Sequence, residues 1–209
     1  MFVNRDSIML RLRNRLPKWW ACTKGATVVE FAIVSSLLFL LMFSVVELSM
    51  HSLAKVLLEG SMREASRYGS TGYAPKGSSR EDNIRAIIDD RTLGLVNISD
   101  PSFKLDVLVY PSFEEIGAPE PFNDEPPLGN LNGIYDVGEE YTDVNGNGQW
   151  DDDMGLSSAG GPGDIVLYTV RYDWPLLSYL ATLFGGPEGK LPLKASMVVR
   201  NEPWGTGGT

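Results

Sequence analysis

The longest apolar run of the sequence extends from Ala26 to Val46, between Lys24 and Glu47. As an α-helix, its 21 residues would span roughly 31 Å, which is close to the thickness of the bilayer hydrocarbon. A secretory signal peptide has a shorter core followed by a small-x-small cleavage site, and the next residues here, ELSMHSLAK, contain no such pattern. The run therefore predicts a transmembrane helix over residues 26–46 that stays in the protein.

The helical pattern continues beyond this run. Between Glu47 and Tyr68, apolar residues recur at spacings of three and four, which places them on one face of a helix. They are Met50, Leu53, Ala54, Leu57, Leu58, Met62 and Ala65. Gly60 lowers the stability of this helix by up to about 1 kcal/mol relative to alanine, and the glycines and proline of YGSTGYAPKG end it. We predict one long helix whose second half is amphipathic.

Shorter patterns predict a second helix and a sheet. Residues 79–95 begin with a capping serine, Ser79, and an acidic first turn. Three segments have the alternation or the β-branched and aromatic content of strands, at 102–110, 164–174 and 193–201. The expected fold class is α+β, pilin-like, with a three-stranded antiparallel sheet covering the amphipathic helix. Residues 47–111 and 163–209 would form this domain.

The charge distribution predicts an orientation in the membrane. Residues 1–25 carry six basic residues against one acid, a local net charge of +5, so the total of −9 leaves −14 on residues 26–209. Basic segments stay cytoplasmic, which places the acidic domain outside the cytoplasm. The same acidity argues against nucleic acid as a partner, because phosphate contacts need positive charge.

Residues 112–162 interrupt the domain as an acidic loop insertion. They contain twelve Asp and Glu, no Lys or Arg, and five prolines, and a loop this long inside a compact domain is usually functional or disordered. Two similar units lie within it, NLNGIYD at 130–136 and DVNGNGQWD at 143–151. Each places side-chain oxygens at alternate positions and then an aromatic residue followed by an aspartate.

The second unit fits the start of a calcium loop, D-x-[DN]-x-[DN]-G. Its candidate ligands are Asp143, Asn145, Asn147 and Gln149, and, because Met154 occupies the twelfth position, one of Asp151, Asp152 and Asp153. The first unit lacks two residues and offers Asn130, Asn132, Asp136 and Glu139. Calcium is the predicted cofactor; the alternative is a turn-rich segment whose acids only keep it soluble.

Glu30 raises a separate question, because it places a carboxylate inside the apolar run. One interpretation is a residue close enough to the interface to be tolerated, helped by the helix dipole. The other is a cut between Gly25 and Ala26. That cut would create an α-amino group with a pKa of about 8, and the Glu30 carboxylate of a neighbouring subunit could pair with it. Glu30 would then set the register of an assembly.

The stretch KGATVVEFA resembles the processing motif of type IV pilin-like proteins. Within that group, GATVVEFAIVSSLLFLL, with REASRYG at 63–69 and VVRNEPW at 198–204, resembles the TadE-like minor pseudopilins of tight-adherence (Flp/Tad) pili. The resemblance implies that a prepilin peptidase removes residues 1–25 as a leader peptide. Gly25 would precede the cut, Ala26 would become the N-terminus, and Glu30 would serve processing and assembly. Other pilins or pseudopilins would be partners through the N-terminal helix.

The predicted function is therefore a non-enzymatic assembly subunit for Tad pilus biogenesis and surface adhesion. It would be held in the bacterial inner membrane with its N-terminus cytoplasmic. The sequence contains no nucleophile elbow, phosphate loop or zinc spacing. The alternative is an uncleaved single-pass membrane protein with an extracytoplasmic calcium-dependent adhesion or sensor domain. Cleavage after Gly25 distinguishes the two hypotheses.

Overall fold

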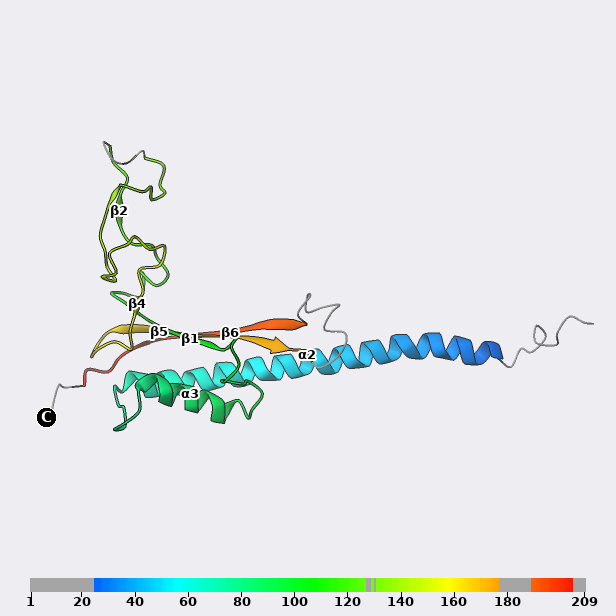
Figure 1. The fold of residues 1–209 in the computed structure, drawn as a ribbon. Helices are drawn as coiled ribbons and strands as arrows, with labels where there is room; N and C mark the ends of the chain where they lie inside the picture. The colour runs from blue at the N-terminus through cyan, green and yellow to red at the C-terminus, as the bar shows by residue number, and fades with distance from the viewer. Residues whose placement is uncertain (1–24, 127–128, 130, 177–188, 205–209) are drawn as a thin grey trace, which may run out of the picture. The chain divides into compact units, whose positions relative to one another are not determined.

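The computed structural model describes residues 25–126, 129, 131–176 and 189–204, and the chain divides into two compact units, Met1–Glu47 and Leu48–Thr209. Figure 1 shows the elements. They are α2 (Ala26–Ser70), α3 (Arg80–Arg91), β1 (Lys104–Tyr110), β2 (Phe122–Asn123), β3 (Glu140–Tyr141), β4 (Leu156–Ser157), β5 (Ile165–Pro175) and β6 (Lys190–Arg200). A long helix that begins in an apolar run, a second helix and a sheet confirm the predicted α+β class.

The part of α2 in the first unit is apolar and exposed around its whole circumference. Val28, Val29, Phe31 and Val34, which point to different sides of the helix, are all more than half exposed, and the helix is long and apolar enough to cross a membrane. A helix that is hydrophobic all round needs an apolar environment. This part of α2 is therefore compatible with single-pass membrane anchoring.

The serines of this run satisfy their hydroxyl groups within the helix. The Ser36 hydroxyl donates to the Ala32 carbonyl at 2.7 Å, and the Ser44 hydroxyl donates to the Leu40 carbonyl at 2.8 Å. Such bonds to the preceding turn spare a hydroxyl the cost of lying unpaired in hydrocarbon. These polar residues therefore do not argue against a membrane position.

The second unit is built around an antiparallel sheet with the strand order β4-β1-β5-β6. Its register forms rows of inward side chains, such as Leu105, Val170 and Ala195 across β1, β5 and β6. The prediction of three strands was wrong by one. The extra strand, β4, is two residues long and pairs with Leu108 and Val109 of β1, so it satisfies part of that edge. Two residues are too short to show alternation in a sequence.

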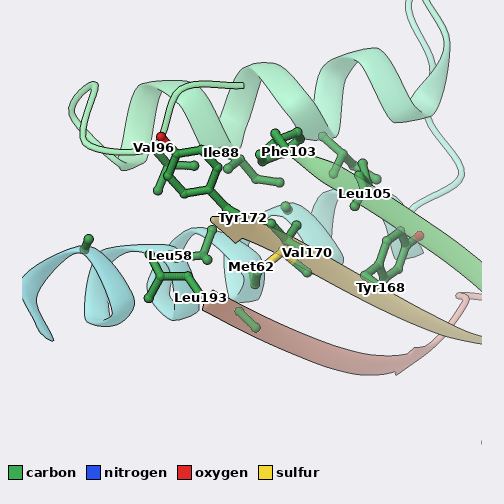
Figure 2. Packing of buried hydrophobic residues seen from close by; sticks show 14 of the residues in the cluster. Leu58, Met62, Ile88, Val96, Phe103, Leu105, Tyr168, Val170, Tyr172 and Leu193 are labelled. Atoms are coloured by element: carbon green, nitrogen blue, oxygen red, sulfur yellow. The ribbon is translucent and has the colours of Figure 1, made fainter. Parts of the chain in front are cut away.

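The core of this unit lies between the sheet and the two helices. Figure 2 shows Leu58 and Met62 of α2 close to Val170 and Leu193 of the strands, with Ile88 of α3 in the same cluster. Ala54, Leu58, Met62 and Ala65 are buried as their spacing predicts, whereas Leu53 is 47% exposed. Burying one such large side chain contributes about 1.5–3 kcal/mol, so the sheet stabilises this part of α2.

Helix α3 begins after Ser79 as its sequence predicts, but it ends at Arg91, four residues before the end of the predicted segment. The Ser79 side chain accepts from the Asp82 amide, and the Asp82 carboxylate accepts from the Ser79 amide, which is a capping box. These bonds lower the pKa of Asp82 below its usual value. At the other end, Arg91 pairs with Glu64 of α2 at 2.7 Å. The cap therefore fixes where α3 begins, and the ion pair joins its last turn to α2.

Candidate functional site

The acidic insertion leaves and re-enters the sheet at neighbouring positions. It begins after β1 and ends before β5, where Tyr110 pairs with Ile165. The returning chain is held by two side chains of the domain. Arg80 Nη1 donates to the Ala159 carbonyl at 2.6 Å, and Asn201 Nδ2 donates to the Gly161 carbonyl at 2.9 Å. The insertion is therefore joined to the sheet, to α3 and to the C-terminal segment.

The second predicted unit forms a loop that closes around the Asp143 carboxylate. Its Oδ1 accepts from the Gly146 amide at 2.6 Å, and its Oδ2 accepts from the Gly148 amide at 2.8 Å. The side-chain amides of Asn145 and Asn147 both donate to Asp151 Oδ2. Four of the predicted ligand residues, Asp143, Asn145, Asn147 and Asp151, therefore belong to one bonded loop.

The three consecutive aspartates of the prediction are separated. Asp151 lies at the loop, whereas Asp152 is exposed. Asp153 Oδ1 accepts from the Tyr110 hydroxyl at 2.8 Å and from the Gly155 amide at 3.0 Å, so its carboxylate faces β1. Burial and this carboxylate raise the pKa of Tyr110 well above its usual range. Among the three acids, Asp151 alone is bonded to the amides of the loop.

The first predicted unit is held together in a related way. Asn132 Nδ2 donates to Asp136 Oδ2 at 2.9 Å, and the Asp136 amide donates to Glu139 Oε2 at 3.0 Å. Asn130 lies outside the described residues. Gln149 of the second unit donates its backbone amide to Asn147 Oδ1 at 2.7 Å. Its main-chain carbonyl and its side-chain carboxamide carry the oxygens for a ligand role.

Two acidic residues of the insertion were missed by the sequence analysis. Glu120 is completely buried, and its carboxylate accepts from the amides of Val144 at 2.7 Å and Asp151 at 3.2 Å. Asp124 accepts from the amides of Leu131 and Gly133 at 2.8 and 2.6 Å. A signal was present, because EPFND at 120–124 has the same spacing of acids and aromatic residue as EEYTD at 139–143.

Aromatic side chains fill the space between the two loops. The rings of Tyr135 and Trp150 are stacked with centroids 4.5 Å apart and planes 13° apart. Phe122 meets Trp150 edge-on at 6.0 Å, and Tyr141 meets Tyr135 edge-on at 5.8 Å. Trp150 Nε1 donates to the Glu120 carbonyl at 2.9 Å. The insertion therefore has a small aromatic core of its own.

The donor set of the second loop suits a hard cation. Carboxylate and amide oxygens are the ligands that calcium prefers, and the loop offers them from Asp143, Asn145, Asn147 and Asp151. Within the described ranges, no three His, Cys, Asp or Glu side chains are grouped as a metal site, so a cation would rely on amide and main-chain oxygens as well. Desolvation, and then the nearby Asp143 carboxylate, raises the pKa of Tyr141.

The predicted processing residues lie at the start of α2. Gly25 directly precedes the helix, Ala26 is its first residue, and Glu30 is exposed in the second turn. Within the part of the chain that the structure describes, a Cβ added at Gly25 would have nothing within 4 Å. The peptide bond between Gly25 and Ala26 therefore lies at the junction between the helix and the chain that precedes it.

Comparison with known proteins identifies this helix. A model of the TadE-like protein family matches residues 25–67. Over this segment the chain is similar to the TadE-like family. The match confirms the resemblance of GATVVEFAIVSSLLFLL to TadE-like proteins. No curated protein and no solved structure shows significant similarity to the chain.

The TadE-like match ends within α2 and does not include the C-terminal VVRNEPW. That segment has contacts inside the domain. The Glu202 amide donates to the Ser70 carbonyl at 2.9 Å, and the Arg80 guanidinium lies 5.2 Å from the centre of the Trp204 ring. The C-terminal segment therefore attaches the end of α2 to the sheet and to α3.

Proposed function

We propose that the protein is a minor pseudopilin, a non-enzymatic subunit of Tad pilus biogenesis and surface adhesion. The observation that carries this proposal is the TadE-like match over residues 25–67, on a helix with an apolar and exposed first half. A prepilin peptidase removes residues 1–25 on the cytoplasmic side. The mature helix waits in the inner membrane with the acidic domain outside, and then packs with other pilin helices to initiate or tip the fibre.

Glu30 has the central chemical role in this proposal. After cleavage, Ala26 carries a cationic α-amino group, and a charge in an apolar environment needs a partner. The Glu30 carboxylate of one subunit neutralises the amino group of its neighbour. This pairing favours one register between the helices, because any other register leaves both charges without a partner in the membrane or in the fibre.

Calcium is the proposed cofactor of the second loop of the insertion. The support is the group of oxygens from Asp143, Asn145, Asn147 and Asp151. Extracellular calcium modules bind with dissociation constants of about 10⁻⁴–10⁻³ M, so the loop fills only after export from the cytoplasm. The cation offsets the mutual repulsion of the carboxylates in the insertion and orders the surface that the insertion offers to a partner.

The first test is the N-terminus of the mature chain. The membrane-extracted protein is analysed by intact mass and N-terminal sequencing, with active or inactivated prepilin peptidase. We expect a chain that begins at Ala26 only with the active enzyme, and no cleavage of the Gly25→Phe variant. A chain that keeps residues 1–25 beside an active peptidase contradicts the proposal and favours the uncleaved adhesion or sensor protein.

The role of Glu30 is tested on the cleaved protein. Glu30→Gln keeps the shape of the side chain and removes its charge. We expect cross-linking to other pilus subunits to fall at least about tenfold, which corresponds to about 1.4 kcal/mol. Glu114→Gln, an exposed acid of the insertion, is the matched control and keeps normal cross-linking. Equal cross-linking by both variants rules out the charge pairing.

A further inference from the structure

The acidic insertion contains a longer internal repeat than its two calcium-like units. Residues 120–136 and 139–151 share one order of residue types. Each has a glutamate, an aromatic residue two positions later and an aspartate two positions after that, followed by an N-x-N-G-x-aromatic-D segment. The first copy has four more residues between its aspartate and this segment. Asp124 is therefore the counterpart of Asp143, and Glu120 is the counterpart of Glu139.

The two copies also share their hydrogen bonds. Asp124 Oδ1 and Oδ2 accept from the amides of Leu131 and Gly133, as the two oxygens of Asp143 accept from the counterparts Gly146 and Gly148. The Ile134 amide donates to Asn132 Oδ1 at 2.7 Å, and its counterpart in the second copy has the same bond at the same length. Asp124 thus supplies the first-position carboxylate that the first unit lacks.

An approximate two-fold relation connects the copies. Phe122 of β2 pairs with Tyr141 of β3, and Tyr135 stacks on Trp150. In both pairs a residue contacts its own counterpart, which is the property of a two-fold interface. The β2–β3 pairing and the aromatic stack join the two loops into one structural unit, so ordering one loop favours the ordered state of the other.

The two buried glutamates differ in one respect. Glu120 Oε2 accepts from the Asp151 amide and Glu139 Oε2 accepts from the Asp136 amide, so each glutamate bonds the last aspartate of the other copy. The second oxygen of Glu120 accepts from two further amides. Glu139 is 4% exposed, and its Oε1 is enclosed with no hydrogen-bond partner in the part of the chain that the structure describes.

This unpaired oxygen is an observation independent of the loop pattern. A buried carboxylate oxygen without a donor is costly unless a positive group compensates it. Glu139 is directed toward the first loop by its bond to the Asp136 amide. Its free oxygen and those of Asp124, Asn132 and Asp136 are oxygen ligands of the kind that a divalent cation prefers. The cation would draw them together, because the described residues contain no preformed group of three acidic side chains.

We propose that the insertion is a paired module with two calcium sites, the second of which is the loop already assigned to calcium in the proposed function. Asp124, Asn132, Asp136 and Glu139 contribute to the first site. The sites fill cooperatively, because the aromatic stack and the β2–β3 pairing couple the ordering of one loop to that of the other. Calcium binding therefore orders the whole module.

Calorimetric calcium titration of the full chain in detergent tests this proposal. We expect two calcium ions per wild-type chain, and one for Asp124→Asn and for Asp143→Asn, with the remaining site binding at least about fivefold more weakly than in wild type. Glu140→Gln removes an equal charge from an exposed position between the loops and keeps both ions. Circular dichroism without calcium checks that each variant is folded, and Asp136→Asn replaces Asp124→Asn if that variant is not.

Each result that contradicts the proposal overturns a different part of it. One calcium ion per wild-type chain, lost in Asp143→Asn and kept in Asp124→Asn, overturns the paired module and preserves the calcium loop of the proposed function. Two ions with unchanged affinity at the remaining site overturn the coupling. Loss of an ion from Glu140→Gln overturns the ligand assignment. No saturable binding at millimolar calcium overturns both calcium proposals, whereas the pilus role is decided separately by cleavage after Gly25.

Discussion

Asp151, Asp152 and Asp153 are adjacent in the sequence but lie in three different surroundings. Asp151 is bonded to the loop, Asp152 is exposed, and Asp153 accepts from a buried tyrosine of β1. Adjacent residues in an extended or turning chain point in different directions. The role of each acid therefore depends on the direction of its side chain, which composition does not reveal.

The bond between Tyr110 and Asp153 gives a residue-scale prediction. Tyr110 is 1% exposed and donates to Asp153 Oδ1 at 2.8 Å. We expect Tyr110→Phe to lower the free energy of unfolding by about 1.5–3 kcal/mol, since a charged acceptor loses its donor. Urea unfolding of the full chain in detergent measures this change. Tyr73→Phe, at a position 61% exposed, should change it by less than about 0.5 kcal/mol; equal effects would contradict the assigned bond.

The pKa of Tyr141 depends on the charge of the second loop. Its pKa is raised by desolvation first and then by the carboxylates around it, beginning with Asp143. A bound calcium ion offsets those carboxylates, so we expect the pKa of Tyr141 to fall when calcium is added. The phenolate then forms at lower pH with calcium than without it. A pH titration of the Tyr141 ring by NMR measures the midpoint, and an unchanged midpoint at saturating calcium argues against a cation in this loop.

At the scale of elements, α2 combines two environments in one helix. Its first part is apolar on every side, and its second part buries one face against the sheet and α3. The amphipathic spacing predicted that face, and Ala54, Leu58, Met62 and Ala65 confirm it. Two glycines interrupt the second part, and their surroundings differ.

Gly60 and Gly69 provide a matched pair for a prediction on this helix. A Cβ on Gly60 meets nothing within 4 Å, whereas one on Gly69 overlaps the Tyr168 hydroxyl and lies 2.8 Å from its Cζ. We expect Gly60→Ala to stabilise the protein by up to about 1 kcal/mol, and Gly69→Ala to destabilise it by about 1–3 kcal/mol through overpacking. Thermal unfolding followed by circular dichroism compares them. Shifts of the same sign would contradict the packing of Tyr168 on α2.

At the scale of the whole molecule, the domain and its insertion have separate cores. The helices and sheet share one cluster of buried side chains, whereas the insertion has its stacked aromatic residues. They meet where Tyr110 pairs with Ile165. Antiparallel strands joined in this way can be closed by a short hairpin, so the order β1-β5-β6 does not need the insertion, whereas the edge strand β4 belongs to it.

Removing the insertion tests this separation. We expect a chain in which Asn-Gly replaces residues 112–163 to unfold cooperatively and to bind no calcium. Its stability should fall by about 2–4 kcal/mol, because Tyr110 loses its bond to Asp153, and Arg80 and Asn201 lose their bonds to the carbonyls of residues 159 and 161. Thermal unfolding and calcium titration in detergent measure the two effects. A chain without a cooperative transition would show that the insertion belongs to the folding core.

Local sequence patterns were sufficient to predict much of the fold of this protein. The apolar run of α2, the Ser79 cap of α3 and the alternation of β1, β5 and β6 each arise from interactions between near neighbours in the chain, so they could be predicted from sequence. The TadE-like segment could also be recognised from the sequence, because its residues follow one another without interruption. The turn chemistry of the second loop was also visible, because its aspartate and asparagines lie a few residues apart.

Tertiary structure decided the features that depend on distant residues. Strand β4 exists because the returning insertion meets the free edge of β1, and Asp124 acts at a loop seven residues further along the chain. The pairing of β2 with β3 places Glu120 beside the amides of residues 144 and 151. Folding brings such partners together although the length of chain between them varies. A hydrogen bond needs its partners to be close in space, and their spacing along the sequence does not determine that closeness.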